Sequence, residues 1–145
     1  MPKITYCLLS LNRLSELQFA VRRTAPYVDR TIVIDGFSTD GTPEWLASKE
    51  CKDLRVEHKC IEQHLYQYGN HHPDQRNPYI YMAGDKGWIL VMDTDEFLKE
   101  DTCRNLRSLA IKAETNGYDG VKFQPHDIWT YIDESIMRDI QHKDF

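Results

Sequence analysis

The sequence of 145 residues lacks several features that would place it in other protein classes. No apolar run approaches the roughly 20 residues needed to cross a bilayer, and Met1-Pro2-Lys3 leads into a strand pattern rather than a signal peptide. The 4 cysteines show no CxxC spacing, and no Asn-x-Ser/Thr acceptor is present. We therefore expect a chain without a transmembrane segment in a reducing, cytoplasmic setting.

An excess of basic residues is also missing. The chain has 18 Lys and Arg against 23 Asp and Glu, which gives a net charge of −5. This balance argues against a nucleic-acid partner held by a broad basic face, but it allows a nucleotide to bind through a metal. With 41% hydrophobic residues and neither internal repeats nor a low-complexity linker, residues 1–145 are expected to form a single domain.

Strand and helix patterns alternate along the chain. Strands are expected at 4–9, 31–34, 54–58, 88–93 and 120–124, and helices at 14–24, from Pro43 onward and at 102–114. The polar and aromatic stretch 62–78 is expected to be a loop or an irregular helix. Strands separated by helices predict an α/β fold with a mostly parallel sheet flanked by helices.

The most informative segment is the apolar run from Trp88 to Met92 that ends on Asp93-Thr94-Asp95-Glu96. It is typical of a buried strand that delivers carboxylates to the carboxyl edge of a sheet, where ligands bind in open α/β folds. Because crowded carboxylates raise each other's pKa, such a group usually shares a cation or a proton. Asp93 and Asp95 alternate along an extended backbone and so can face one hard cation, Mg²⁺ or Mn²⁺.

Acidic residues after a strand can instead cap the following helix. We favour that interpretation for Asp101, which adjoins Thr102 at the start of a helical stretch. Glu96 can support a metal site indirectly or face water. A helix-loop-helix calcium site is excluded, since counting from Asp93 puts Leu98 where Gly is needed and Arg104 where Glu is needed.

A second segment, from Ile34 to Thr42, reads Ile-Asp-Gly-Phe-Ser-Thr-Asp-Gly-Thr. A strand that ends on Asp35 and opens into a Gly-, Ser- and Thr-rich turn places one carboxylate at the sheet edge beside a helix N-terminus. Asp35 could there accept hydrogen bonds from a base or ribose. For Ser38, Thr39 and Asp40 we favour ordinary turn and capping roles.

The order of four segments resembles glycosyltransferase family 2. They are Leu8-Leu9-Ser10-Leu11-Asn12-Arg13, Val33 to Thr42, Gln75-Arg76-Asn77 and Val91-Met92-Asp93-Thr94-Asp95-Glu96. The resemblance covers the chain from Ile4 to about Gln124 and implies the GT-A fold, a nucleotide-binding α/β domain. Members of this family usually continue well past the point where this chain stops, so part of the acceptor region is expected to be missing.

The resemblance also implies roles for individual residues. Leu9, Leu11 and Asp35 would hold the nucleobase, and Arg76 would lie near the nucleotide. Asp93-Thr94-Asp95, the Asp-x-Asp motif, would hold the ribose and the Mn²⁺ or Mg²⁺ on the diphosphate. The expected partners are a UDP- or GDP-linked sugar donor and a carbohydrate or other hydroxyl acceptor.

The catalytic residues cannot be named from the sequence. An inverting transferase needs a general base, and His126, Asp127, Asp133 and Glu134 are available, although a solvated loop explains each of them better. The histidines at 58, 64, 71 and 72 lack paired zinc-ligand spacing. The tyrosines at 66, 68, 79 and 81 are more typical of packing than of a sugar-binding platform.

Two other functions remain open. One is a non-catalytic nucleotide-sugar-binding module. The other is a phosphotransferase of the haloacid dehalogenase type, in which Asp93 would be the nucleophile and Asp95 its acid/base partner, although that family usually carries its motif on the first strand. A homo-oligomer is also possible, because a minimal domain with an exposed apolar sheet edge would gain from self-association.

Overall fold

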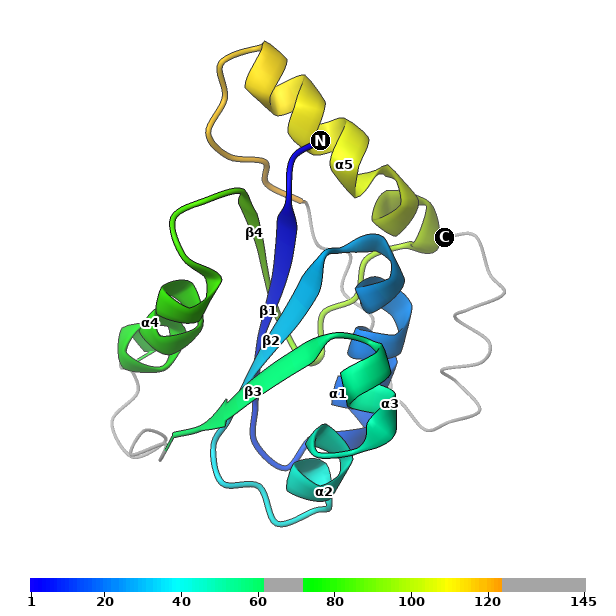
Figure 1. Ribbon diagram of the computed structural model, residues 1–145, viewed down its shortest axis with the longest axis vertical. Helices are drawn as coiled ribbons and strands as arrows, with labels where there is room; N and C mark the ends of the chain where they lie inside the picture. Colours follow the sequence, from blue (N-terminus) through cyan, green and yellow to red (C-terminus); the bar gives the residue numbers. More distant parts are fainter. Residues whose placement is uncertain (62–71, 124–145) are drawn as a thin grey trace.

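The structure is a computed structural model that describes residues 1–61 and 72–123, and for 72–76 the backbone alone. Figure 1 shows a twisted sheet with helices on both faces. The elements follow in this order: β1 (Ile4–Ser10), α1 (Leu14–Thr24), the 3-10 turn η1 (Ala25–Tyr27), β2 (Arg30–Asp35), α2 (Thr42–Leu46), α3 (Lys49–Asp53), β3 (Val56–Cys60), α4 (His72–Ala83), β4 (Trp88–Asp93) and α5 (Glu100–Thr115).

The sheet is parallel throughout its described strands, in the order β3-β2-β1-β4. The predicted α/β class with a parallel sheet is therefore confirmed. β1 lies in the middle, with β2 on one side and β4 on the other, so the chain winds outward from β1 in both directions. Such an arrangement places helices on both faces of the sheet.

Alternating side chains of the strands build two hydrophobic clusters. On one face, the even-numbered residues of β1 (Ile4, Tyr6 and Leu8) pack with residues of α1, α2, α3 and α5. On the other face, Cys7 of β1 and Ile32 and Ile34 of β2 pack against α4. Side chains that alternate along β1 therefore contribute to both cores, and this explains why β1 is mostly apolar on both faces.

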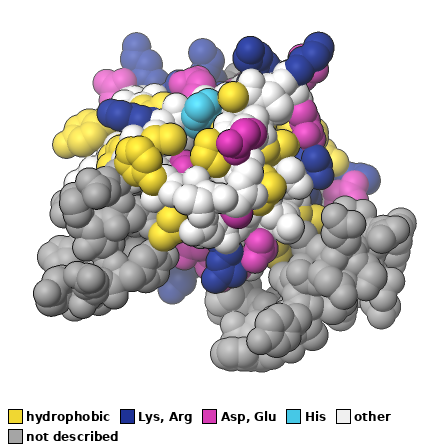
Figure 2. All heavy atoms as spheres, turned by 90° about the horizontal axis from the view of Figure 1, so that it is seen from below, with side chains coloured by type: hydrophobic (Ala, Val, Ile, Leu, Met, Phe, Trp, Pro, Cys, Tyr) yellow, Lys and Arg dark blue, Asp and Glu magenta, His cyan; other side chains and the backbone are white. Residues whose placement is uncertain are grey.

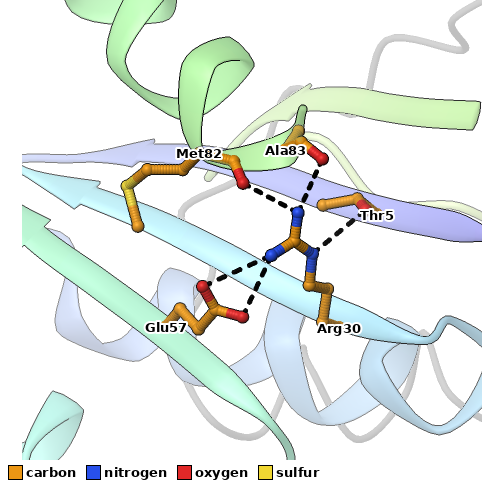
Figure 3. A network of polar contacts seen from close by, with 5 residues as sticks. All are labelled: Thr5, Arg30, Glu57, Met82 and Ala83. Atoms are coloured by element: carbon orange, nitrogen blue, oxygen red, sulfur yellow. Dashed lines mark hydrogen bonds and ion pairs between the residues drawn. The ribbon is translucent and has the colours of Figure 1, made fainter. Parts of the chain in front are cut away.

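Helix α4 is fastened to the sheet by Arg30 at the start of β2 (Figure 3). The guanidinium donates to the carbonyl oxygens of Met82 (2.7 Å) and Ala83 (2.6 Å), which lie in the last turn of α4. It also pairs with Glu57 of β3 (3.2 Å) and contacts the hydroxyl of Thr5 (3.4 Å). One cation therefore neutralises the negative C-terminal end of α4 and joins it to three strands.

Several predicted elements differ from the structure. The expected helix from Pro43 begins at Thr42 and is broken into α2 and α3, because the side chain of Ser48 accepts from the N–H of Cys51 (3.3 Å) and starts a new helix. The third strand begins at Val56 rather than Leu54, whose N–H still bonds to the carbonyl of Glu50 (2.9 Å). Of the two alternatives given for 62–78, a loop or an irregular helix, the structure has a helix from His72 onward, α4 with Pro78 inside it, while 62–71 fall outside the described residues.

The prediction of a strand at 120–124 is wrong for residues 120–123, which have no strand structure. Gly120, Val121 and Lys122 are exposed, and only Phe123 packs against the core. Val121-Lys122-Phe123 alternates apolar and polar residues as strands do, but strand formation also needs a neighbouring strand to pair with. Gln124 lies outside the described residues. Within the described segments, no helix is both long and apolar enough to span a membrane.

Candidate functional site at the carboxyl edge of the sheet

The strand register brings the two predicted carboxylate segments to one edge of the sheet. Asp35 at the end of β2 pairs with Ser10 of β1, and Asp93 at the end of β4 pairs with Leu9. The point where the winding reverses therefore lies between β1 and β4, and ligands of open α/β sheets bind outside the carboxyl ends at such a point. Figure 2 looks onto this edge: Lys and Arg side chains are mostly around its margin, with hydrophobic and acidic ones nearer the centre.

Residues Asp93 to Glu96 form a tight turn directly after β4. The N–H of Glu96 donates to the carbonyl of Asp93 (3.0 Å), and the Glu96 carboxylate accepts from the N–H of Asp93 (2.8 Å). Thr94 is buried and Asp95 is exposed. Because α5 begins only at Glu100, Asp93 and Asp95 do not cap it. Glu96 closes the turn that carries them and is itself exposed, so its side chain faces water; its support of a metal site stays a prediction.

The segment after β2 is organised around the fully buried carboxylate of Asp35. Its two oxygens accept from the N–H (2.9 Å) and the hydroxyl (2.6 Å) of Ser38. The thiol of Cys60 at the end of β3 lies 4.0 Å away. Burial and the nearby Asp35 charge raise the pKa of this thiol, so Cys60 is a neutral neighbour. Asp35 thus lies at the carboxyl edge, as predicted, but it is buried and holds its own loop together; its contact with a base or ribose stays a prediction.

Asn12 joins the loop after β1 to the loop after β2. Its N–H donates to the hydroxyl of Ser38 (2.8 Å), and its side-chain oxygen accepts from the N–H of Thr39 (2.7 Å). Asn12 has a positive φ of 51°, which asparagine tolerates better than most residues. Asn12 belonged to the family-like pattern but had no role from the sequence, since neither its conformation nor its partners 26 and 27 residues away can be read locally.

Asp40 has the capping role that the sequence predicted. One of its carboxylate oxygens accepts from the N–H of Leu14 at the start of α1 (2.9 Å). The other accepts from the N–H (3.2 Å) and the hydroxyl (2.6 Å) of Thr42 at the start of α2. Burial raises the pKa of Asp40, but the hydrogen bonds outweigh it and lower the pKa overall. A single carboxylate therefore anchors the N-termini of two helices beside the candidate site.

The capping role predicted for Asp101 is wrong. The N-cap of α5 is Lys99, which makes no side-chain cap, and Asp101 lies inside the first turn with Glu100. Its charge still suits the positive end of the helix. Helix α5 begins at Glu100, two residues before the predicted start at Thr102.

Other predicted residues are placed less completely. Leu9 is half-buried and packs at the margin of the α4 cluster, and Leu11 follows β1 as a half-buried residue at the carboxyl edge. Arg76 lies on α4, but its side chain is outside the described part, as are His126, Asp127, Asp133 and Glu134 in full.

Tyr79 is buried in the core, as predicted, whereas Tyr81 is 82% exposed. Across the described residues, no three or more His, Cys, Asp and Glu side chains gather as a metal-binding group.

No family model matches this sequence, and no curated protein matches it significantly. Among solved structures, it is similar to the mannosyltransferase PcManGT from Pyrobaculum calidifontis in complex with GDP-Man and Mn²⁺, with 18% identity, a TM-score of 0.55 and 75% of this chain covered. A glucosyl-3-phosphoglycerate synthase from Mycobacterium tuberculosis, in complex with Mn²⁺, UDP and glucosyl-3-phosphoglycerate, has 18% identity, a TM-score of 0.46 and 66% of this chain covered.

The match spans 32% of the mannosyltransferase and 36% of the synthase. At such low identity the likeness bears on architecture alone. The predicted fold is confirmed by the first of these structures together with the order of the parallel strands. The described part of this chain is therefore a GT-A type fold, comparable with about a third of a glycosyltransferase.

Proposed function

We propose that the chain is the donor-binding part of a glycosyltransferase that moves a sugar from a nucleotide diphosphate to a hydroxyl acceptor. The observation that carries this proposal is the Asp93-Thr94-Asp95 turn at the carboxyl end of β4, next to the reversal point of the sheet. The mannosyltransferase with the same fold was solved with GDP-Man and Mn²⁺, and this supports a nucleotide-sugar donor and a divalent metal here.

The residues present fit a metal that is shared with the donor. Mg²⁺ is commonly bound by one or two carboxylates and completed by substrate phosphates, so a site with only Asp93 and Asp95 from the protein is reasonable. This also explains why the described residues contain no larger group of metal ligands. When bound, Mn²⁺ or Mg²⁺ would stabilise the negative charge that develops on the leaving diphosphate. Thr94, which is buried and lies between Asp93 and Asp95 in the sequence, would anchor this turn to the protein.

The nucleotide itself would bind across the ends of β1, β2 and β4. Leu9 and Leu11 would contact the base, Asp35 would shape its pocket, and Arg76 would approach the diphosphate. Because both Asp35 oxygens already accept from Ser38, direct base recognition by Asp35 would need spare acceptor capacity on those oxygens. Asp35 is therefore better suited to positioning the loop than to making the first contact.

The test is calorimetric titration of UDP and GDP, with and without Mn²⁺, into the wild-type protein and the Asp95→Asn variant. We expect metal-dependent binding that falls at least tenfold in Asp95→Asn, with an unchanged Tm. The matched control is Asp85→Asn, an exposed carboxylate in the turn before β4 at the opposite edge of the sheet. Binding of neither diphosphate by folded wild-type protein, or equal binding by Asp95→Asn, would overturn the proposal.

A non-catalytic nucleotide-sugar-binding module is the second candidate, because the residues proposed for the metal and the nucleotide account for donor binding alone. Donor hydrolysis or transfer to a panel of hydroxyl acceptors separates the two, since a binding module would bind the donor and release no diphosphate. Acyl-phosphate formation on Asp93 with a phosphoryl donor would instead support the phosphotransferase. We expect none.

A further inference from the structure

Phe37 combines an exposed aromatic ring with an unfavourable backbone conformation. Its φ is +64°, in the left-handed region that bulky residues rarely adopt, and the residue is 59% exposed. Glycine would take this conformation without steric cost. Since most of the ring is in contact with solvent, core packing does not account for a phenylalanine here. Residues held in strained conformations cluster at ligand sites, where the surrounding structure keeps them in place.

The surrounding structure fixes Phe37 from both sides. Before it, the N–H of Gly36 continues the β1–β2 ladder by donating to the carbonyl of Ser10 (2.8 Å). After it, Ser38 is tied to the buried Asp35 carboxylate through its N–H (2.9 Å) and its hydroxyl (2.6 Å). Ser38 is held in turn by the N–H of Asn12 (2.8 Å). The loop therefore presents the Phe37 ring from a rigid support at the carboxyl edge.

We propose that Phe37 is a binding residue whose ring stacks on the base of the nucleotide. This inference rests on the proposed function and deepens it, because it names the part of the donor that this residue recognises. Asp35 is fully buried and hydrogen-bonded to Ser38. A base that approaches the end of β2 would therefore contact the exposed side chains of this loop before it could reach Asp35. Phe37 is the large exposed apolar side chain of that loop. Any base offers a flat π-face to such a ring, which gives affinity with little base selectivity.

The experiment compares Phe37→Leu, Phe37→Gly and Phe37→Tyr in titrations with GDP, UDP and inorganic diphosphate, all with Mn²⁺. Stacking predicts that Phe37→Leu and Phe37→Gly bind GDP and UDP about tenfold more weakly. Inorganic diphosphate, which has no base, should bind within twofold of wild type. Phe37→Tyr keeps the aromatic face and should restore nucleotide affinity.

Two features keep the outcome interpretable. Phe37→Gly relieves the left-handed strain, so its Tm should not fall, and weaker binding cannot then be blamed on unfolding. Tyr81→Leu is the matched control, because Tyr81 is 82% exposed on α4 near its Arg30-bound end, away from the carboxyl edge. Its nucleotide affinity should be unchanged.

The results separate this inference from the proposed function. Equal affinity of wild type and Phe37→Leu for both nucleotides would overturn the stacking role while leaving the nucleotide site in place. A parallel loss of inorganic diphosphate binding would also overturn it, since the residue would then act through loop structure. If wild-type protein bound neither GDP nor UDP, the proposed function would fail first, and the role of Phe37 with it.

Discussion

The buried carboxylate of Asp35 accepts two hydrogen bonds from one residue, Ser38, through its N–H (2.9 Å) and its hydroxyl (2.6 Å). The same hydroxyl accepts from the N–H of Asn12, so one side chain links the loops after β1 and β2. Charges are costly to bury unless they are hydrogen-bonded. The stability of the candidate site therefore depends on Ser38 as much as on the acidic residue.

Replacement of Ser38 by alanine should destabilise the fold. The Ser38→Ala change removes one partner of a buried charge and one acceptor for Asn12, which together predict a loss of about 1–3 kcal/mol in the free energy of unfolding. Urea denaturation measures it, with Ser108→Ala, an exposed position on α5, as the control. A Ser38→Ala variant as stable as Ser108→Ala would show that the Asp35 carboxylate does not need this partner.

Arg30 should control how firmly α4 is held on the sheet. The Arg30→Ala change removes two hydrogen bonds to the last carbonyls of α4 and the ion pair with Glu57. A hydrogen bond to a charged group contributes about 1.5–3 kcal/mol to the free energy of unfolding. Hydrogen exchange should accelerate in α4 more than in α1. Arg104→Ala, which breaks an exposed ion pair with Glu100, is the control and should change little. Uniform acceleration across the protein would contradict a local role for Arg30.

Two glycines with positive φ allow a paired test of close packing. A Cβ at Gly87 (φ +97°) would lie 2.6 Å from the carbonyl oxygen of Lys3, whereas a Cβ at Gly117 (φ +72°) would meet nothing within 4 Å. Gly117→Ala should therefore cost only the left-handed strain, about 1–2 kcal/mol. Gly87→Ala should cost clearly more, since the start of β4 must also move away from Lys3. Thermal unfolding compares them, and equal Tm values would be evidence against the close β1–β4 contact.

The lowered pKa of Glu50 predicts that this residue stabilises the protein less in acid. Hydrogen bonds from Arg22 and then Trp45 lower the pKa of its carboxyl from 4.5 to about 2. A folded-state pKa below the unfolded one stabilises the protein above about pH 4.5, and this stabilisation is lost as pH falls toward 2. Because the Arg22 and Glu50 side chains are 52% and 38% exposed, solvent screening limits the effect to about 1 kcal/mol.

The measurement is urea denaturation of wild type and Glu50→Gln at pH 7 and pH 2.5. Wild type should be more stable at pH 7, and the difference between the two proteins should shrink at pH 2.5. Glu44→Gln, an exposed residue of α2, provides the control. A difference between wild type and Glu50→Gln that did not depend on pH would rule out the ionised carboxylate as its cause.

The sequence was most informative where one physical requirement dominated. The helix at 14–24 and the strand ending on Asp93 were predicted with their observed bounds, since amphipathic spacing and an unbroken apolar run leave few alternatives. Prediction was poorer where an element depends both on its own sequence pattern and on a neighbouring element. Val121-Lys122-Phe123 alternates like a strand, but pairing with a neighbour decides whether a strand forms, and a single segment does not reveal its neighbours.

In the candidate site, too, the sequence predicted the positions of residues on strands but not the hydrogen bonds between loops. The positions of Asp35 and Asp93 at the carboxyl edge follow from their places after two strands, which the sequence reveals. The bonds that organise the loops do not, because Asn12 reaches Ser38 across 26 residues and Asp40 reaches Leu14 across 26 as well. The left-handed conformation of Phe37 was equally hidden, since no local pattern favours it for an aromatic residue.

Glu96 should position the proposed metal-binding turn without itself binding the metal. Its carboxylate accepts from the N–H of Asp93 (2.8 Å), and the Glu96 N–H closes the turn onto the Asp93 carbonyl (3.0 Å). Glu96→Ala removes only the side-chain bond, so we expect Mn²⁺-dependent affinity for GDP to fall about tenfold rather than vanish, in line with the loss of an indirect ligand support.

Glu96→Gln is the discriminating variant, because its side-chain oxygen can still accept from the Asp93 N–H while the negative charge is gone. If Glu96 acts by holding the turn, Glu96→Gln should bind Mn²⁺ and GDP close to wild type, and Glu96→Ala should not. If Glu96→Gln instead loses affinity to the same degree as Asp95→Asn, the charge of Glu96 takes part in metal binding directly. The proposed pair of metal-binding carboxylates, Asp93 and Asp95, would then have to be extended to three.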